Sequence, residues 1–354
     1  MPKPARRRPR TFPFRTLLLL GLLLLLGCAY AVWYHDTRLP LRGPEEPPLT
    51  LLVEPGASAL EVGRSLHSMG LVRHPEVFHL LVLERRASGK IRAGEYVLEG
   101  PLSLEEVLGK LLAGTVVRQT VTFPEGTDLG AMAEIAAAQG IPAPAFREAA
   151  REVSLIVDLD AEATDLEGYL FPDTYDITRR PDAAQALVRR MVARFRQVMV
   201  PERDRLAASG RSLREVVTLA SLVERETALA SERPRVAAVF LNRLQKKMPL
   251  QTDPTVIYAM KRAGRWDGNI RKKDLELDSP YNTYRYAGLP PGPIASPGRE
   301  ALRAVLAPAS VQDLYFVSRN DGSHQFSETL TQHERAVDRY QRRRSPAARE
   351  GTKG

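Results

Sequence analysis

The most informative helix of the sequence lies at residues 213–230, which read LREVVTLASLVERETALA. At about 100° per residue, its apolar side chains fall on one stripe, formed by Val216, Leu219, Ala220, Leu222 and Val223. The stripe predicts an amphipathic helix whose apolar face packs against a core.

Two glutamates border this stripe. Glu226 falls between Leu219 and Leu222 at one edge, and Glu224 falls at the opposite edge. Because a carboxyl group among leucines is poorly solvated when ionised, its pKa should rise, as a general acid near neutral pH requires. Periodicity does not choose between the two glutamates. It also leaves open an ordinary surface role for both glutamates, in which Glu226 pairs with Arg225 or Arg233.

The chain around this helix is rich in helical patterns and poor in strands. Helices are expected at 128–158, with Thr127 as a cap, at 182–207 and at 299–306, and a strand at 314–317. Two segments, 166–177 and 278–298, break the pattern with Gly and Pro. We therefore expect a larger, helix-rich domain with short strands over residues 124–341.

A smaller α+β module is expected before it, at residues 49–123. Strands are predicted at 49–53, 96–98 and 116–123, with helices beginning after Ser58, after Pro75 and after Ser103. Ser103 and Glu106 have the spacing of a capping box. No cluster of acids, His or Cys in this module indicates chemistry.

The apolar run at residues 16–34, TLLLLGLLLLLGCAYAVWY, is about long enough to span a bilayer. Residues 1–15 carry six basic residues and no acid, which places them in the cytoplasm and the rest of the chain outside. A cleaved signal peptide is the alternative. Residues 35–48 are polar and Pro-rich, so a linker is expected there.

Cys28 is the only cysteine, so an intramolecular disulfide is impossible. It is interpreted as a small residue inside the membrane helix, with lipidation as in a bacterial lipoprotein as the alternative. Both interpretations tether the chain to the inner (cytoplasmic) membrane by its N-terminal segment.

The net charge of +9 is concentrated in the two ends of the 354-residue chain. The remaining body is close to neutral, which argues against a nucleic-acid partner. Residues 342–354 are basic and small and are expected to be disordered. The six histidines show no HExxH or similar spacing, and no nucleotide-binding motif occurs, so no metal or cofactor is expected.

Several ordered stretches together resemble the endolytic murein transglycosylase family (MltG, also called YceG-like). They are 166–175 (LEGYLFPDTY), 220–233 (ASLVERETALASER), 251–258 (QTDPTVIY), 281–284 (YNTY), 288–298 (GLPPGPIASPG), 314–317 and 324–326. The similarity runs from the membrane segment to about residue 340.

The resemblance implies a lytic transglycosylase that cleaves the MurNAc–GlcNAc bond of nascent glycan strands. The second Glu of the E-x-E-T stretch is the family's catalytic residue and corresponds to Glu226. One carboxyl group would serve first as acid and then as base for the muramic C6 hydroxyl, which leaves a 1,6-anhydroMurNAc end. The resemblance also implies that the small module is similar to a LysM-type glycan-binding domain, and that peptidoglycan synthases are partners in ending strand elongation.

Other candidate substrate-binding residues lie in the matching stretches. They are Gln251, Thr252, Asp253, Tyr281, Asn282, Thr283 and Tyr284, with Glu167, Asp173 and Tyr175 as candidate walls of a cleft. Turn or capping roles are as consistent with their sequence context. Glu224 is expected to be a solvated group on the helix surface, with tuning of the site as the alternative.

Two alternatives stay open at this point. A hydrolytic muramidase would use the same Glu226 with water as acceptor and would leave reducing ends. A wall-binding scaffold would hold glycan through the 49–123 module and recruit synthases without turnover.

Overall fold

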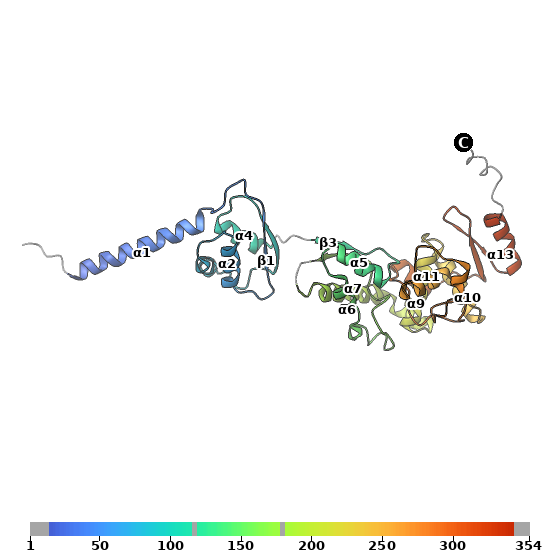
Figure 1. Ribbon diagram of the computed structural model, residues 1–354. Coiled ribbons are helices and arrows are strands. Elements are labelled where there is room, and N and C mark those ends of the chain that lie inside the picture. The colour runs from blue at the N-terminus through green and yellow to red at the C-terminus, as the bar shows by residue number, and fades with distance from the viewer. Residues whose placement is uncertain (1–13, 115–118, 178–180, 343–354) are drawn as a thin grey trace, which may run out of the picture. The chain divides into compact units, whose positions relative to one another are not determined.

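The computed structural model of the chain describes residues 14–114, 119–177 and 181–342. These residues divide into two compact units, one ending at residue 114 and the other beginning at residue 119 (Figure 1). Helices dominate, and the strands among the described residues form two-stranded antiparallel sheets. The predicted α+β class is confirmed.

The first unit contains the small module. Its elements in chain order are β1 (Leu49–Val53), α2 (Ala59–Ser68), α3 (Pro75–Glu84), β2 (Gly94–Leu98) and α4 (Leu104–Ala113). The two strands pair antiparallel, with Leu49 opposite Leu98. Ser58 and Ser103 form the N-terminal capping boxes of α2 and α4, so the predicted box at Ser103 is confirmed.

Helix α1 (Phe14–Arg38) precedes this module and is long and apolar enough to cross a membrane. Its leucines are exposed, which suits lipid contact. The helix extends beyond the predicted run at 16–34 into the predicted linker, where Asp36 and Thr37 are buried.

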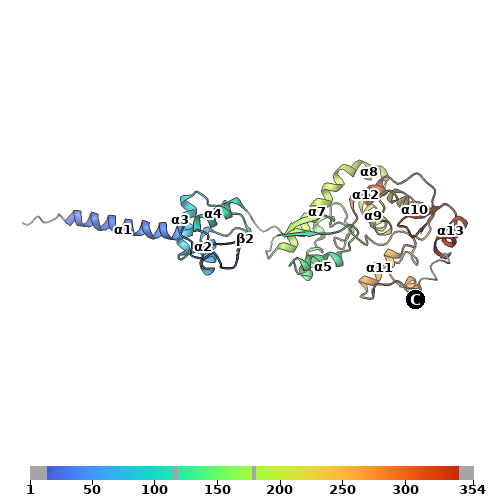
Figure 2. The ribbon, with the colours of Figure 1, turned by 90° about the horizontal axis from the view of Figure 1, so that it is seen from above.

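The last turns of α1 pack against the module, beside α3 and α4 (Figure 2). Trp33 lies against the module's core. Asp36 forms an ion pair with Arg73 at 3.3 Å, and Arg38 forms one with Glu105 of α4 at 3.4 Å. Residues 35–38 therefore belong to the folded unit and do not act as a free spacer.

The strand predicted to close the small module belongs to the second unit instead. Strand β3 (Gln119–Thr122) pairs antiparallel with β4 (Thr174–Ile177), with Val121 opposite Tyr175. Val121 and the following Phe123 pack in the larger core. The first three residues of the predicted strand, 116–118, lie outside the described residues. Local alternation predicted a strand but could not identify its partner.

The second unit is helix-rich. Its further elements are α5 (Leu129–Ala138), α6 (Ala143–Ala149), η1 (Val153–Leu155), α7 (Ala183–Met199), η2 (Val200–Glu202), α8 (Arg203–Ser209), α9 (Leu213–Glu226), α10 (Arg233–Gln245), α11 (Asp253–Arg262), η3 (Lys272–Glu276), α12 (Arg299–Leu306), β5 (Tyr315–Ser318), β6 (His324–Ser327), α13 (Leu330–Val337) and a π-helical turn η4 (Asp338–Arg342). The helix predicted at 182–207 is divided where Pro201 stands, because proline lacks the N–H that a continuing helix needs. Asp128, rather than the predicted Thr127, caps α5.

Helix α9 lies at the centre of this unit. It contacts α10, α11 and α12, and every side chain from Val216 to Val223 is buried. The predicted single apolar stripe was too narrow, since Thr218 and Ser221 are buried as well. Ser221 satisfies its hydroxyl by donating to the Thr218 carbonyl (2.7 Å) and accepting the N–H of Ile294 (3.1 Å).

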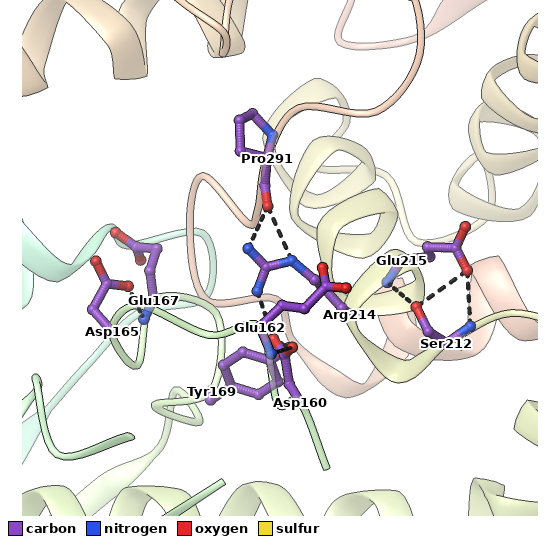
Figure 3. Close-up of polar contacts among 9 residues, drawn as sticks. All are labelled: Asp160, Glu162, Asp165, Glu167, Tyr169, Ser212, Arg214, Glu215 and Pro291. Carbon is purple, nitrogen blue, oxygen red and sulfur yellow. Dashed lines mark hydrogen bonds and ion pairs between the residues drawn. The ribbon is translucent and has the colours of Figure 1, made fainter. Parts of the chain in front are cut away.

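A polar network ties the loop at Pro291 to α9 (Figure 3). Arg214 donates to the carbonyl of Pro291 (3.0 Å) and to Asp160 (2.7 Å), and Tyr169 donates to the same Asp160 (2.7 Å). Nearby Gly168 has a φ of +83°, and a Cβ there would lie 2.5 Å from Pro293. The segments that break the helical pattern therefore pack closely beside the central helix.

Candidate active site

Glu226 is the last residue of α9 and is partly buried. The helix begins at a capping box, in which Ser212 accepts the N–H of Glu215 (3.2 Å) and Glu215 accepts the N–H of Ser212 (2.8 Å; Figure 3). It ends at Thr227, whose φ of −137° and ψ of 131° are extended. The Glu226 carboxyl group thus lies at the negative end of the α9 dipole, which disfavours its ionised form.

One oxygen of Glu226 is held by a neighbouring hydroxyl. Thr252, the N-cap of α11, donates a short hydrogen bond from Oγ1 to Oε1 of Glu226. Thr252 is itself fixed, because its N–H donates to Thr283 Oγ1 (3.1 Å) and its carbonyl accepts from Thr255 Oγ1 (2.7 Å). Among the described residues, none donates a hydrogen bond to Oε2 of Glu226.

Burial raises the pKa of Glu226, and the Thr252 hydrogen bond opposes this rise. Asp253 raises the pKa further, whereas electrostatic interactions with His324 and Arg243 lower it. The predicted direction of the pKa shift is confirmed. A carboxyl group with this environment can hold a proton at a higher pH than an exposed glutamate.

Three polar side chains surround this carboxyl group. Asp253 accepts the hydroxyl of Tyr284 at 2.6 Å, and burial raises the pKa of Tyr284, which keeps this hydroxyl protonated. Arg243 is buried and donates to the carbonyls of Leu314 (2.6 Å) and Leu250 (2.9 Å). Burial lowers the pKa of Arg243, and its charge interacts favourably with Glu226.

Glu232 and His324 form a second pair beside the site. Glu232 accepts the backbone N–H of His324 at 2.9 Å and lies 2.7 Å from its Nδ1. It also accepts the hydroxyl of Thr227, the residue after Glu226, at 3.4 Å. The ring of His324 packs edge-on against Phe316, with 5.4 Å between ring centroids. The β5–β6 hairpin is therefore fixed next to the end of α9.

Glu224 is not the solvated surface group that was expected. Its side chain is 5% exposed, pairs with Arg233 at 2.6 Å and accepts the N–H of Gly298 at 2.9 Å. Arg233 therefore pairs with Glu224 rather than with Glu226. Both oxygens of Glu224 are used in packing α9 against α10 and the 298 turn, whereas Glu226 keeps one oxygen available.

Of the other residues in the 251–253 and 281–284 stretches, two contact or support Thr252, and two have structural contacts elsewhere. Thr283 supports Thr252, and Gln251 lies at a φ of 49° with its N–H donated to the Thr283 carbonyl (3.1 Å). Asn282 is buried and holds the loop by donating to the carbonyls of Leu275 and Leu277 (2.9 and 2.8 Å). Tyr281 packs instead on Tyr258, with ring centroids 4.9 Å apart.

The three candidates from the 166–177 segment lie elsewhere in the domain. Glu167 is buried and accepts the N–H of Leu129 at the start of α5 (3.0 Å) and the hydroxyl of Tyr258 (3.2 Å). Asp173 pairs with Arg194 at 2.9 Å, and the buried Tyr175 donates to the carbonyl of Phe171 (2.7 Å). No hydrogen bond between described residues joins these three to Glu226.

Sequence reasoning did not select Arg243, Glu232 or His324 as parts of this site. Arg243 and Glu232 lie on or at the start of α10, and His324 lies on a hairpin far along the chain. Two of them lay in matching stretches, Glu232 in 220–233 and His324 in 324–326, but neither was selected as a site residue. Among the described residues, no group of three His, Cys, Asp or Glu side chains is close enough to share a metal ion.

Residues 51–339 match the family model described as the YceG-like family, and the chain belongs to this family. It is similar to the endolytic murein transglycosylase of Bacillus subtilis, with 32% identity over 323 residues that cover 85% of this chain and 87% of that protein. It is also 29% identical to the endolytic murein transglycosylase of Streptococcus pneumoniae, covering 93% of this chain and 65% of that one.

A crystal structure of a yceG-like protein from Listeria monocytogenes has a similar fold. The TM-score is 0.56 at 29% sequence identity, and the match covers 82% of this chain and all of that one.

Proposed function

We propose that this protein is a membrane-anchored endolytic transglycosylase that cuts the MurNAc–GlcNAc bond of peptidoglycan strands, with Glu226 as the catalytic residue. The observation that carries the proposal is the single carboxyl group at the end of α9. Burial raises its pKa, and Thr252 holds one of its oxygens while the other is open to a ligand. The names of the relatives from B. subtilis and S. pneumoniae support the same reaction.

The first chemical step uses Glu226 as an acid. Because Thr252 donates to Oε1, the proton of the neutral carboxyl group resides on Oε2. It passes to the glycosidic oxygen as the bond from that oxygen to the muramic C1 breaks. The departing GlcNAc keeps this proton, and the C1 centre becomes cationic.

The second step uses the same group as a base. The Glu226 carboxylate takes the proton of the muramic C6 hydroxyl, and O6 bonds to C1, which closes a 1,6-anhydro ring. The positive charge of Arg243 favours the ionised form at this stage. The proton returns to Glu226, so no water is consumed and the residue is ready for another cycle.

The cellular setting forms part of the proposal. Helix α1 would span the inner membrane with the basic N-terminus in the cytoplasm and both folded units outside. The small module, whose β1–α2–α3–β2 order suits a LysM-like domain, would hold glycan near the membrane. Cleavage there would end the elongation of nascent strands beside peptidoglycan synthases.

The test is mass spectrometry of the products formed from uncrosslinked glycan strands. The full chain should release fragments with anhydro-muramic ends, and Glu226→Gln should release none. Glu134→Gln is the matched control, because Glu134 is an exposed helix glutamate of the same domain. Equal cleavage by wild type and Glu226→Gln would remove Glu226 from its role.

A hydrolytic muramidase is the second candidate, and Asp253 is the observation that favours it. Its charge acts on Glu226, and hydrolases commonly use a second carboxylate to activate water. In that case the products carry reducing ends, and Asp253→Asn abolishes them. Intact strands with every variant would favour the scaffold.

A further inference from the structure

A cavity of about 510 Å³ opens on the second unit between α10, β6, α13 and the turn η4. It is not part of the Glu226 carboxyl environment. Its walls include three arginines from separate elements: Arg235 of α10, Arg335 of α13 and Arg339 of η4. A cavity of this size with several guanidinium groups suits a ligand that carries carboxylates.

The three arginines differ in how they are held. Arg235 forms two hydrogen bonds to Asp313 (2.5 and 3.2 Å) and lies over the ring of Phe326, 4.5 Å from its centroid. Arg335 and Arg339 are exposed, and neither has an acidic partner among the described residues. The first arginine is built into the wall, and the other two are available to a ligand.

The cavity is also lined by one carboxylate without a hydrogen-bond partner among the described residues. Glu328 lies on its rim and interacts electrostatically with Arg235, and its carboxylate forms no hydrogen bond to the described residues. The two available guanidinium groups and this carboxylate give the cavity groups of both signs. A ligand with carboxylates and an amine complements it better than a simple anion does.

The cavity lies next to the proposed catalytic residue along two elements. Glu232 and His324 form the pair beside Glu226. Arg235 follows Glu232 by three residues on α10, and Phe326 follows His324 by two residues on β6. Three residues of a helix span about 4.5 Å, the advance from Glu232 to Arg235, and two residues of a strand span about 7 Å, the advance from His324 to Phe326. The wall of the cavity therefore begins about the length of one sugar ring from the Glu232–His324 pair.

We propose that this cavity binds the stem peptide of the muramic acid whose glycosidic bond is cut. The inference rests on the proposed function. The peptide leaves the sugar ring through the lactyl group, so it starts close to the scissile bond. It carries free carboxylates and, on its diamino acid, an ammonium group. Arg335 and Arg339 pair with the carboxylates, and Glu328 pairs with the ammonium group.

The experiment compares two substrates with one set of variants. The full chain and its Arg335→Gln/Arg339→Gln double variant are given uncrosslinked strands with intact peptides, and the same strands after an amidase has removed the peptides. Arg189→Gln/Arg190→Gln on α7 is the control, because it removes two exposed charges from another element of the same domain. The readout is kcat/KM for each substrate.

The double variant should lose about tenfold in kcat/KM on peptide-bearing strands, as expected for two exposed ion pairs of moderate strength. It should match wild type on peptide-free strands, and the control should match wild type on both. An equal loss on both substrates, or no loss on peptide-bearing strands, would overturn the proposal.

A binding measurement separates this proposal from the proposed function. In the Glu226→Gln background, calorimetry follows the binding of a disaccharide-pentapeptide and of the peptide-free disaccharide. Tighter binding of the peptide form that the arginine variant abolishes supports the cavity even if wild type cuts neither strand. Equal binding of the two ligands overturns the cavity proposal even if strands are cleaved.

Discussion

At the scale of single residues, Thr252 occupies one carboxyl oxygen of Glu226, the proposed catalytic residue, and leaves the other without a hydrogen bond from the described residues. Its hydrogen bond also lowers the pKa of Glu226 against the effect of burial. Thr252→Val should therefore raise that pKa further. In the proposed mechanism the protonated form is the active acid, so the fall of kcat/KM at high pH should move to a higher pH. In addition, kcat should drop about tenfold because the carboxyl group is less well oriented.

The measurement is the pH profile of kcat/KM for Thr252→Val against wild type. Thr122→Val is the control, because Thr122 is an exposed threonine that bonds only the Thr174 hydroxyl across β3 and β4. A high-pH limb that stays in place, or that moves to lower pH, would contradict the assigned role of Thr252.

Glu226 should also weaken the fold near neutral pH. Because its pKa is raised by folding, its stabilising effect is present at low pH and is lost as the pH rises through the unfolded and then the folded pKa. Glu226→Gln should thus have a higher Tm than wild type at pH 7, and this difference should shrink towards pH 4. Glu134→Gln should show no such gain, and a lower Tm for Glu226→Gln at pH 7 would refute the argument.

The sequence allowed the raised pKa of Glu226 to be predicted, since its leucine neighbours are local. It could not predict that Arg233 pairs with Glu224, or that Glu232 and His324 meet beside the site. Those pairs join residues from different elements, and their geometry is fixed only when α10 and the β5–β6 hairpin pack against α9.

At the scale of elements, Glu167 links two helices through a single buried carboxyl group. It accepts the first N–H of α5 and the Tyr258 hydroxyl of α11, and burial raises its pKa to about 8 from 4.5. The stability that it contributes is complete below about pH 4.5 and is lost as the pH rises to about 8.

Glu167→Gln should remove this pH dependence. The wild-type free energy of unfolding should fall by up to about 1.4 kcal/mol per pH unit from this one group between those limits, and the variant should lack that part of the slope. Urea unfolding of both proteins from pH 5 to pH 8 measures it. Parallel slopes would show that Glu167 does not titrate in this range.

Helix positions were more predictable than strand partners. The capping box at Ser103 and the helix at 299–306 were predicted from side chains within a few residues. The pairing of β3 with β4 joins segments about fifty residues apart, and alternation carries no information on which strand lies alongside.

At the scale of the whole molecule, the first unit joins the apolar helix to the small module. Trp33→Ala should lower the Tm of this unit, because Trp33 packs against the module core. Tyr34→Ala is the matched control, since Tyr34 is 47% exposed. Both are measured on the full chain in detergent, and equal effects of the two substitutions would contradict the docking.

The packing of α1 on the module also affects how a truncated protein should be produced. A fragment that starts after Arg38 lacks Trp33 and leaves Arg73 without Asp36, so the surface beside α3 and α4 is bared to water. Such a fragment should self-associate through that face. A fragment that keeps residues 33–38, with the leucines before them replaced, should stay monomeric. A soluble form of the protein should therefore retain the last turns of the apolar helix.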